Sequence, residues 1–196
     1  MTEDELVEAI RTSVAGTDVP SPASREAIAE TEAACGYRLP PLLVRLLTEV
    51  ANGGFGPRGH VYGVRGHDWY SAEHFADMTE AALEIAGDPE WQRERDGMLP
   101  LIDWGCAIAT WIDCRDPSGP LWVWDPNLCC LGHAMFPLDQ TLAQMLEVSL
   151  SDPYGEPFYA GYFADLRLSK RGCAPRQWRN GRVEAAARLG DGSGIT

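Results

Sequence analysis

The sequence predicts an α+β domain, because patterns typical of helices come first, a run of adjacent strand patterns follows, and one further helix pattern closes the series. Apolar residues recur with a helical period up to about residue 85, and strand-like patterns begin at Leu99. Strict alternation of strand and helix, which would indicate a doubly wound sheet, is absent. With 196 residues, the chain is long enough for one hydrophobic core and too short for two.

Three helices are expected in the N-terminal quarter of the chain. The first spans residues 2–14 and begins with a Thr-x-x-Glu capping box. The second begins near Ser21-Pro22 and ends at Gly36, since glycine readily adopts the left-handed conformation of a helix end. The third begins at Leu39-Pro40-Pro41, buries a stripe of leucines and stops at Asn52-Gly53-Gly54.

The later elements are mostly strands. In the last of three consecutive strand patterns, Trp122 and Trp124 share one face of the sheet, and Leu121 and Val123 share the other. Beyond residue 150 the pattern weakens, and a short helix is expected at residues 183–189. We expect strands at residues 61–64, 99–104, 107–113, 121–125 and, more briefly, 131–136, and helices at residues 71–85 and 138–150.

The formal net charge of −13 is unevenly distributed. Residues 1–165 contain 27 acidic and 9 basic side chains, a net charge of −18, whereas residues 166–196 contain 2 acidic and 7 basic ones, a net charge of +5. We interpret residues 1–165 as one domain and residues 166–196 as a basic, mobile tail. An acidic body repels nucleic acid and suits a basic protein partner, although the same acidity also serves solubility.

The sequence favours a cytoplasmic protein. No apolar run approaches the ~20 residues of a membrane helix, and the N-terminus is acidic, whereas a secretory signal begins with basic residues. We therefore expect no membrane partner, and free buried thiols rather than disulfides. Arginine outnumbers lysine 15 to 1, a bias typical of GC-rich bacteria. The six cysteines are Cys35, Cys106, Cys114, Cys129, Cys130 and Cys173.

Two motifs suggest chemistry but lack the context that the chemistry needs. The run from Gly54 to Gly59 matches the dinucleotide-binding fingerprint in letters, but a helix precedes it and a strand follows, the reverse of a phosphate-binding loop. The run Cys129-Cys130-Leu131-Gly132-His133 lacks the second pair of ligands of a zinc site. No strained-nucleophile signature is present. We therefore expect no cofactor, no metal and no enzymatic activity.

Aspartates and aromatic residues are the candidate binding residues. Paired carboxylates can perform acid–base chemistry or bind a metal, but aspartate at strand ends is also common in turns. We favour the structural interpretation and keep an acidic docking patch as the alternative. Trp69 and Tyr70 lie in a glycine-flanked loop and are candidate interface anchors. The four aspartates are Asp103, Asp113, Asp116 and Asp125.

Two blocks of residues are similar to a known family. The first block is Cys35-Gly36-Tyr37-Arg38-Leu39-Pro40, an apolar helix and then Asn52-Gly53-Gly54-Phe55-Gly56. The second joins Leu99-Pro100-Leu101-Ile102, Leu121-Trp122-Val123-Trp124-Asp125 and the closing helix. Over residues 24–150 they resemble the SUKH superfamily, which contains yeast cell-wall regulators of the Smi/Knr type and many bacterial immunity proteins. Residues 64–98 and the tail depart from the family's shortest pattern.

The resemblance implies an α+β fold with a mixed, mostly antiparallel sheet flanked by helices. It implies no catalytic residues, and it implies protein binding: neutralisation of a cognate toxin in bacteria, or scaffolding of signalling partners in fungi. We therefore predict a non-enzymatic immunity protein that binds a basic toxin domain. The alternatives are an intracellular regulatory module of the Smi/Knr type and, further removed, a hydrolase or nucleotide-binding enzyme.

Overall fold

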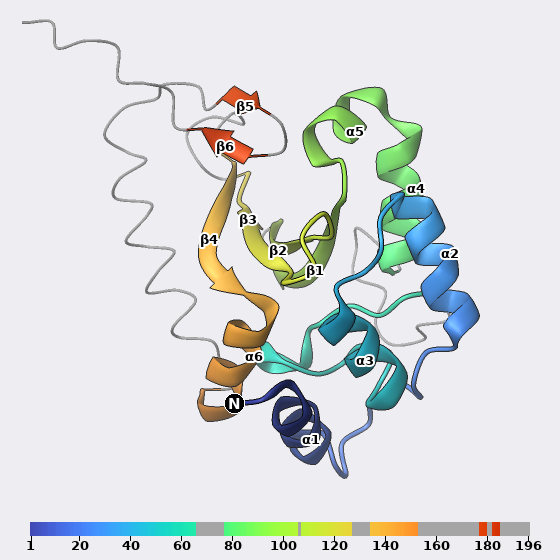
Figure 1. The fold of residues 1–196 in the computed structure, drawn as a ribbon, viewed down its shortest axis with the longest axis vertical. Helices are drawn as coiled ribbons and strands as arrows, with labels where there is room; N and C mark the ends of the chain where they lie inside the picture. The colour runs from blue at the N-terminus through green and yellow to red at the C-terminus, as the bar shows by residue number, and fades with distance from the viewer. Residues whose placement is uncertain (66–76, 106, 127–133, 153–176, 180–181, 185–196) are drawn as a thin grey trace, which may run out of the picture.

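A four-stranded antiparallel sheet and six α-helices form most of the described protein (Figure 1). The computed structural model describes residues 1–65, 77–105, 107–126, 134–152, 177–179 and 182–184. The helices are α1 (Glu3–Ser13), α2 (Arg25–Cys35), α3 (Pro41–Glu49), α4 (Met78–Gly87), α5 (Pro89–Arg95) and α6 (Leu142–Ser151). The strands are β1 (Met98–Gly105), β2 (Ile108–Asp113), β3 (Pro120–Trp124), β4 (Met135–Thr141), β5 (Gln177–Arg179) and β6 (Arg182–Glu184). The predicted α+β class is confirmed.

Side-chain caps determine where the first two helices begin. The predicted capping box is present at α1, where Thr2 and Glu5 exchange hydrogen bonds between side chain and backbone. The start predicted for α2 near Ser21 is wrong, because the Ser24 hydroxyl accepts a hydrogen bond from the third N–H of the helix and is therefore the cap. Gly36 ends α2 in the left-handed conformation, as predicted.

The sheet has the strand order β1-β2-β3-β4, and each neighbouring pair is antiparallel. The four strands are therefore antiparallel throughout rather than mixed. The predicted boundary between the last strand and the closing helix is wrong: β4 continues to Thr141 and α6 begins at Leu142. The reason is a second capping box, formed by Thr141 and Gln144. Residues 131–133 of the predicted strand lie outside the described residues.

The main hydrophobic core lies between one face of the sheet and helices α1, α3 and α6. The leucine stripe predicted for α3 is buried there, including Leu43, Leu46 and Leu47 at 0% exposure. A smaller cluster on the opposite face contains Trp111 and Trp122, with Trp124 packed against it. The two faces predicted for β3 are therefore confirmed, and the sheet packs against apolar side chains on both sides.

The glycine-rich segment after α3 is a turn, as predicted. Gly54 and Gly56 have φ angles of 77° and 73°, a region that favours glycine. A Cβ atom on Gly56 would lie 2.8 Å from Val61, so this position also requires a residue without a side chain. The strand predicted at residues 61–64 is reduced to a single bridge between Val61 and Ile102. This turn brings the chain from α3 to the edge of β1.

Two helices and a hairpin differ from the sequence prediction. Helix α4 begins at Met78, where the Asp77 carboxylate accepts a hydrogen bond from the Glu80 N–H, and residues 71–76 of the predicted helix lie outside the described residues. Helix α5 is absent from the sequence prediction. The helix predicted at residues 183–189 is wrong at its start, because residues 183–184 pair with β5 in strand β6; residues 185–189 lie outside the described residues.

Candidate protein-interaction surface

The four aspartates named as candidates lie in two pairs at opposite ends of the sheet. Asp103 pairs with Ala109 near the end of β1, and Asp125 follows Trp124, which also pairs with Ala109. Asp113 ends β2 at the other end of the sheet, beside the turn that contains Asp116. Antiparallel pairing separates the two pairs by the length of a strand, so the four carboxylates do not gather in one patch.

The pair at the β2–β3 turn is engaged in local structure. The Asp113 carboxylate accepts two hydrogen bonds from the Arg115 guanidinium, both 2.7 Å long, and is 8% exposed. This bidentate pair raises the pKa of Arg115. Asp116 is exposed, and its Oδ1 accepts hydrogen bonds from the N–H and the hydroxyl of Ser118, each 2.8 Å long. Asp113 is therefore neutralised, whereas the Asp116 carboxylate lies at the surface within the turn.

The other pair is more buried. Asp125 is 3% exposed. Asp103 is half-buried, and its Oδ1 accepts a 2.7 Å hydrogen bond from the Gly105 N–H. Burial of Tyr62, followed by the negative charge of Asp103, raises the pKa of the Tyr62 phenol. These contacts agree with the structural interpretation of aspartates at strand ends.

The two predicted aromatic anchors, Trp69 and Tyr70, lie outside the described residues, as do Cys129, Cys130 and His133 of the zinc-like motif. Contact of these aromatics and of the four aspartates with a partner stays a prediction. Among the described residues, no three His, Cys, Asp or Glu side chains are placed to hold a metal ion.

A different surface combines exposed charge with exposed apolar side chains. Residues 77–96, here called the acidic α4–α5 segment, contain seven acidic and two basic residues. Six of the seven acids are exposed. In the described part of the chain, Leu83 at 51% and Trp91 at 37% are the strongly exposed large apolar side chains besides Met1, and both belong to this segment. Helix α5 lies at the periphery of the molecule (Figure 1).

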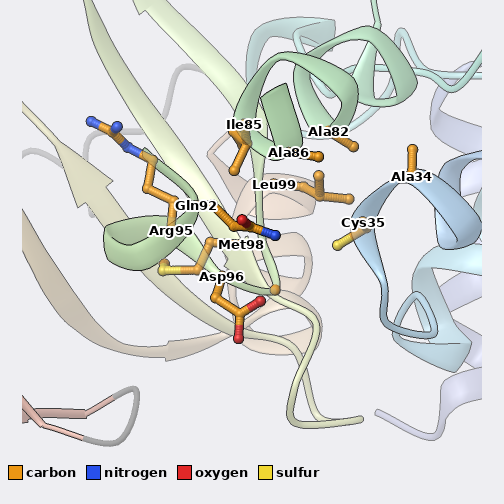
Figure 2. Close-up of a pocket in the computed structure, with 11 residues that line it drawn as sticks. Ala34, Cys35, Ala82, Ile85, Ala86, Gln92, Arg95, Asp96, Met98 and Leu99 are labelled. Carbon is orange, nitrogen blue, oxygen red and sulfur yellow. The ribbon is translucent and has the colours of Figure 1, made fainter. Parts of the chain in front are cut away.

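A buried arginine attaches this segment to the sheet. The Arg95 guanidinium carbon lies 4.2 Å from the ring centre of Trp91, 4.6 Å from that of Trp124 and 5.4 Å from that of Trp111. Arg95 is 4% exposed. Figure 2 shows its side chain directed away from the small pocket below α4. Arginine stacked on aromatic faces gains cation–π energy, so these contacts hold α5 over β2 and β3.

This arginine lacks the usual hydrogen bonds of a buried charge. Its Nε and Nη1 groups, like the Trp111 Nε1 group, are buried without a hydrogen-bond partner in the described structure. Burial lowers the pKa of Arg95. Tryptophan often dominates binding energy at protein interfaces, so the exposed Trp91, which contacts Arg95, is a candidate anchor for a partner.

Sequence reasoning missed this surface because it missed α5. A seven-residue helix is too short for a periodic apolar pattern. A signal was nevertheless present in Asp88-Pro89: the Asp88 carboxylate accepts hydrogen bonds from two N–H groups at the start of α5, and proline is favoured in the first helical turn. The stack on Arg95 has no such signal, since it depends on the pairing of β2 with β3.

A four-stranded antiparallel sheet with helices packed against it, and a surface that combines exposed acids with exposed apolar side chains, are features of a small α+β domain. The model of the SMI1 / KNR4 family (SUKH-1) matches residues 22–148, more than half of the chain, and the protein belongs to this family. The predicted SUKH membership is thus confirmed. Members are generally non-enzymatic immunity or regulatory domains.

Two further findings concern the sequence and the described helices. No curated protein matches the sequence. None of the helices in the described ranges combines the length and the apolar character that a membrane crossing requires.

Proposed function

We propose that the protein is an immunity protein that neutralises a cognate bacterial toxin, and that it binds the toxin through the acidic α4–α5 segment. The observation that supports this most is the joint exposure of Trp91, Leu83 and six acids in twenty residues. Family membership supports an immunity or Smi/Knr-type domain. The segment also falls within residues 64–98, which depart from the shortest family pattern, as suits a surface matched to one partner.

In this mechanism, the acidic protein competes with the anionic substrate of the toxin for the toxin's basic surface. A toxin that attacks nucleic acid needs a basic surface for its phosphates. The acidic α4–α5 segment would cover such a surface and exclude the anionic substrate. Opposite charges speed the encounter of the two proteins, while Trp91 and Leu83 bury apolar area in the complex and slow its dissociation. The protein needs no reactive group for this role.

Co-purification from the native host tests the function. The tagged protein is expected to retain one stoichiometric partner whose effector domain kills cells unless this protein is co-expressed. Retention of a signalling or housekeeping partner without toxicity would support instead a regulatory module of the Smi/Knr type, the second role that family membership supports.

Charge reversal tests the surface. The double variant Glu90→Arg/Glu94→Arg is expected to weaken toxin binding at least tenfold and to reduce the dependence of the affinity on salt, because the reversed charges repel a basic partner. The matched control is Asp18→Arg/Asp139→Arg, which makes the same charge change at exposed acids outside the segment. Equal loss in both variants would attribute binding to net charge alone and refute the proposed surface.

A further inference from the structure

A cavity lies where the end of α1, the end of α6 and the glycine-rich turn after α3 meet. Helices α1 and α6 pack against each other (Figure 1), and the loop that follows α1 also lines the cavity. The cavity has a volume of about 490 Å³, within the range of about 300–1,000 Å³ that small-molecule sites occupy. Of the lining residues that the structure describes, none belongs to the acidic α4–α5 segment.

Apolar side chains form much of the cavity wall. Val14 and Val19 come from the chain after α1, Phe55 comes from the glycine-rich turn, and Leu150 comes from α6. Phe55 is fully buried, whereas the two valines and Leu150 are half-buried and keep apolar surface that a ligand can cover. The cavity can therefore take up the apolar body of a ligand.

Three hydroxyl groups in the lining have already committed their protons. The hydroxyls of Ser13, Thr17 and Ser149 each donate to the backbone carbonyl three residues earlier, at 2.7, 2.7 and 2.8 Å. A hydroxyl has one proton and two lone pairs, so each of these groups can offer a ligand only an acceptor. Ser149 is 7% exposed, which shields its oxygen from water. The polar part of the lining is therefore suited to a ligand that donates hydrogen bonds.

The charges around the cavity favour a cation. Asp18 lines it and is exposed. The last turns of α1 and α6 also line it, and the C-terminal end of a helix has a partial negative charge. Arg58 is the one basic side chain among the described lining residues, but its guanidinium carbon lies 5.8 Å from the ring centre of Trp104, on β1 and outside the lining. This arginine therefore has a cation–π contact away from the cavity.

We propose that this cavity binds a small organic ammonium ion, a primary amine that carries an aliphatic or aromatic apolar body. Such an amine is protonated at neutral pH. Its ammonium group has three donors and no acceptor, which matches a lining of hydroxyl lone pairs and one carboxylate. The apolar body would fill the space beside Val14, Val19 and Leu150. The site is separate from the proposed toxin-binding surface, so either can fail without the other.

NMR titration of the isotope-labelled full-length protein with three probes of similar shape tests the ligand class. Phenethylamine, phenethyl alcohol and hydrocinnamate carry an ammonium, a hydroxyl and a carboxylate group on the same phenyl body. The amine is expected to shift the backbone amide signals of lining residues such as Gly54 and Leu150. It should bind about tenfold more tightly than the alcohol, because charge-assisted hydrogen bonds are stronger than neutral ones.

Three results of this titration would overturn the proposal. Absence of shifts at the lining residues would show that the cavity takes up no amine. Equal affinity for the amine and the alcohol would show that only the apolar body is recognised. Tightest binding of hydrocinnamate would show that Arg58 makes the cavity a site for anions.

Variants that fold normally by circular dichroism test the residues. Asp18→Asn is expected to weaken phenethylamine binding about threefold and to leave the alcohol unaffected, because an exposed carboxylate contributes modestly. The matched control is Asp139→Asn, the same change at an exposed acid of β4 outside the lining, which should have no effect. Equal weakening in both variants would attribute binding to net charge and overturn the proposal. Val14→Trp fills the cavity and should abolish amine binding; unchanged binding in this variant would place the amine elsewhere.

Discussion

The side-chain amide of Asn52 forms two hydrogen bonds with the backbone of Val64, one in each direction. Its oxygen accepts from the Val64 N–H at 2.8 Å, and its nitrogen donates to the Val64 carbonyl at 3.1 Å. Asn52 is 3% exposed and Val64 is fully buried. The amide supplies backbone partners for Val64, beyond the bridge that Val61 forms with Ile102 of β1, which explains why asparagine precedes the glycines of this motif.

Asn52→Ala is expected to lower the free energy of unfolding by about 2–4 kcal/mol, because it leaves two buried backbone groups unpaired at about 1–3 kcal/mol each. Urea unfolding monitored by circular dichroism measures the loss. The control Gln92→Ala, at an exposed position on α5, should stay within about 0.5 kcal/mol of the parent. If both variants lose the same stability, the amide has no special role in the turn.

Two glycines with similar positive φ angles but different ψ angles, 2° at Gly36 and −157° at Gly56, allow a comparison. Gly36 has φ 80° and open space where a Cβ atom would lie, with nothing within 4 Å, whereas at Gly56, with φ 73°, a Cβ would meet Val61 at 2.8 Å and Leu146 at 3.1 Å. Gly36→Ala should cost about 1–2 kcal/mol from the left-handed backbone alone. Gly56→Ala should cost about 1–3 kcal/mol more, because it adds overpacking to a backbone conformation, with ψ −157°, that is essentially restricted to glycine. Equal melting temperatures for the two variants would contradict the close approach seen at Gly56.

Local features could be predicted from the sequence, because the residues that form them lie close together in the chain. The capping box of Thr2 and Glu5, the left-handed end at Gly36 and the two faces of β3 all depend on residues a few positions apart. The start of α2 was misplaced because Ser21 and Ser24 are both acceptable caps, and only packing selects one. The short helix α5 has no apolar period at all.

The candidate surface was less predictable because it depends on pairing between distant residues. Strand ends place aspartates near turns, but the antiparallel register decides that Asp103 and Asp113 lie at opposite ends of the sheet. The Arg95 stack requires Trp111 and Trp124 on neighbouring strands and a helix above them. The resemblance to the family could not supply this part, because residues 64–98 depart from its shortest pattern.

The raised pKa of the Tyr62 phenol predicts that the protein loses stability as the pH rises above 10. Burial and then Asp103 raise its pKa above the usual 10.0 in the folded protein. Above pH 10 the unfolded chain therefore releases this proton before the folded protein does, and unfolding becomes more favourable as pH rises. Below pH 10 the contribution of Tyr62 is fully present. Tyr62→Phe should flatten the fall in the free energy of unfolding between about pH 10 and pH 11.5, measured by urea titration, while an unchanged slope would contradict the raised pKa.

At Arg95, two contributions to stability oppose each other. The cation–π contacts are favourable, whereas burial of a charged group with two unpaired N–H groups is unfavourable. Ring contacts at partly buried sites contribute about 0.5–2 kcal/mol, whereas each of its two unpaired donors costs about 1–3 kcal/mol. Arg95→Met keeps apolar contact with the tryptophans and removes the charge, so it should raise the free energy of unfolding by about 1 kcal/mol. Arg95→Lys keeps a buried charge and loses the planar stacking, so it should lower that free energy by about 1–2 kcal/mol. Urea unfolding followed by circular dichroism compares the two variants. A lower free energy of unfolding for the methionine variant than for the lysine variant would mean that the favourable ring contacts outweigh the cost of the unpaired donors.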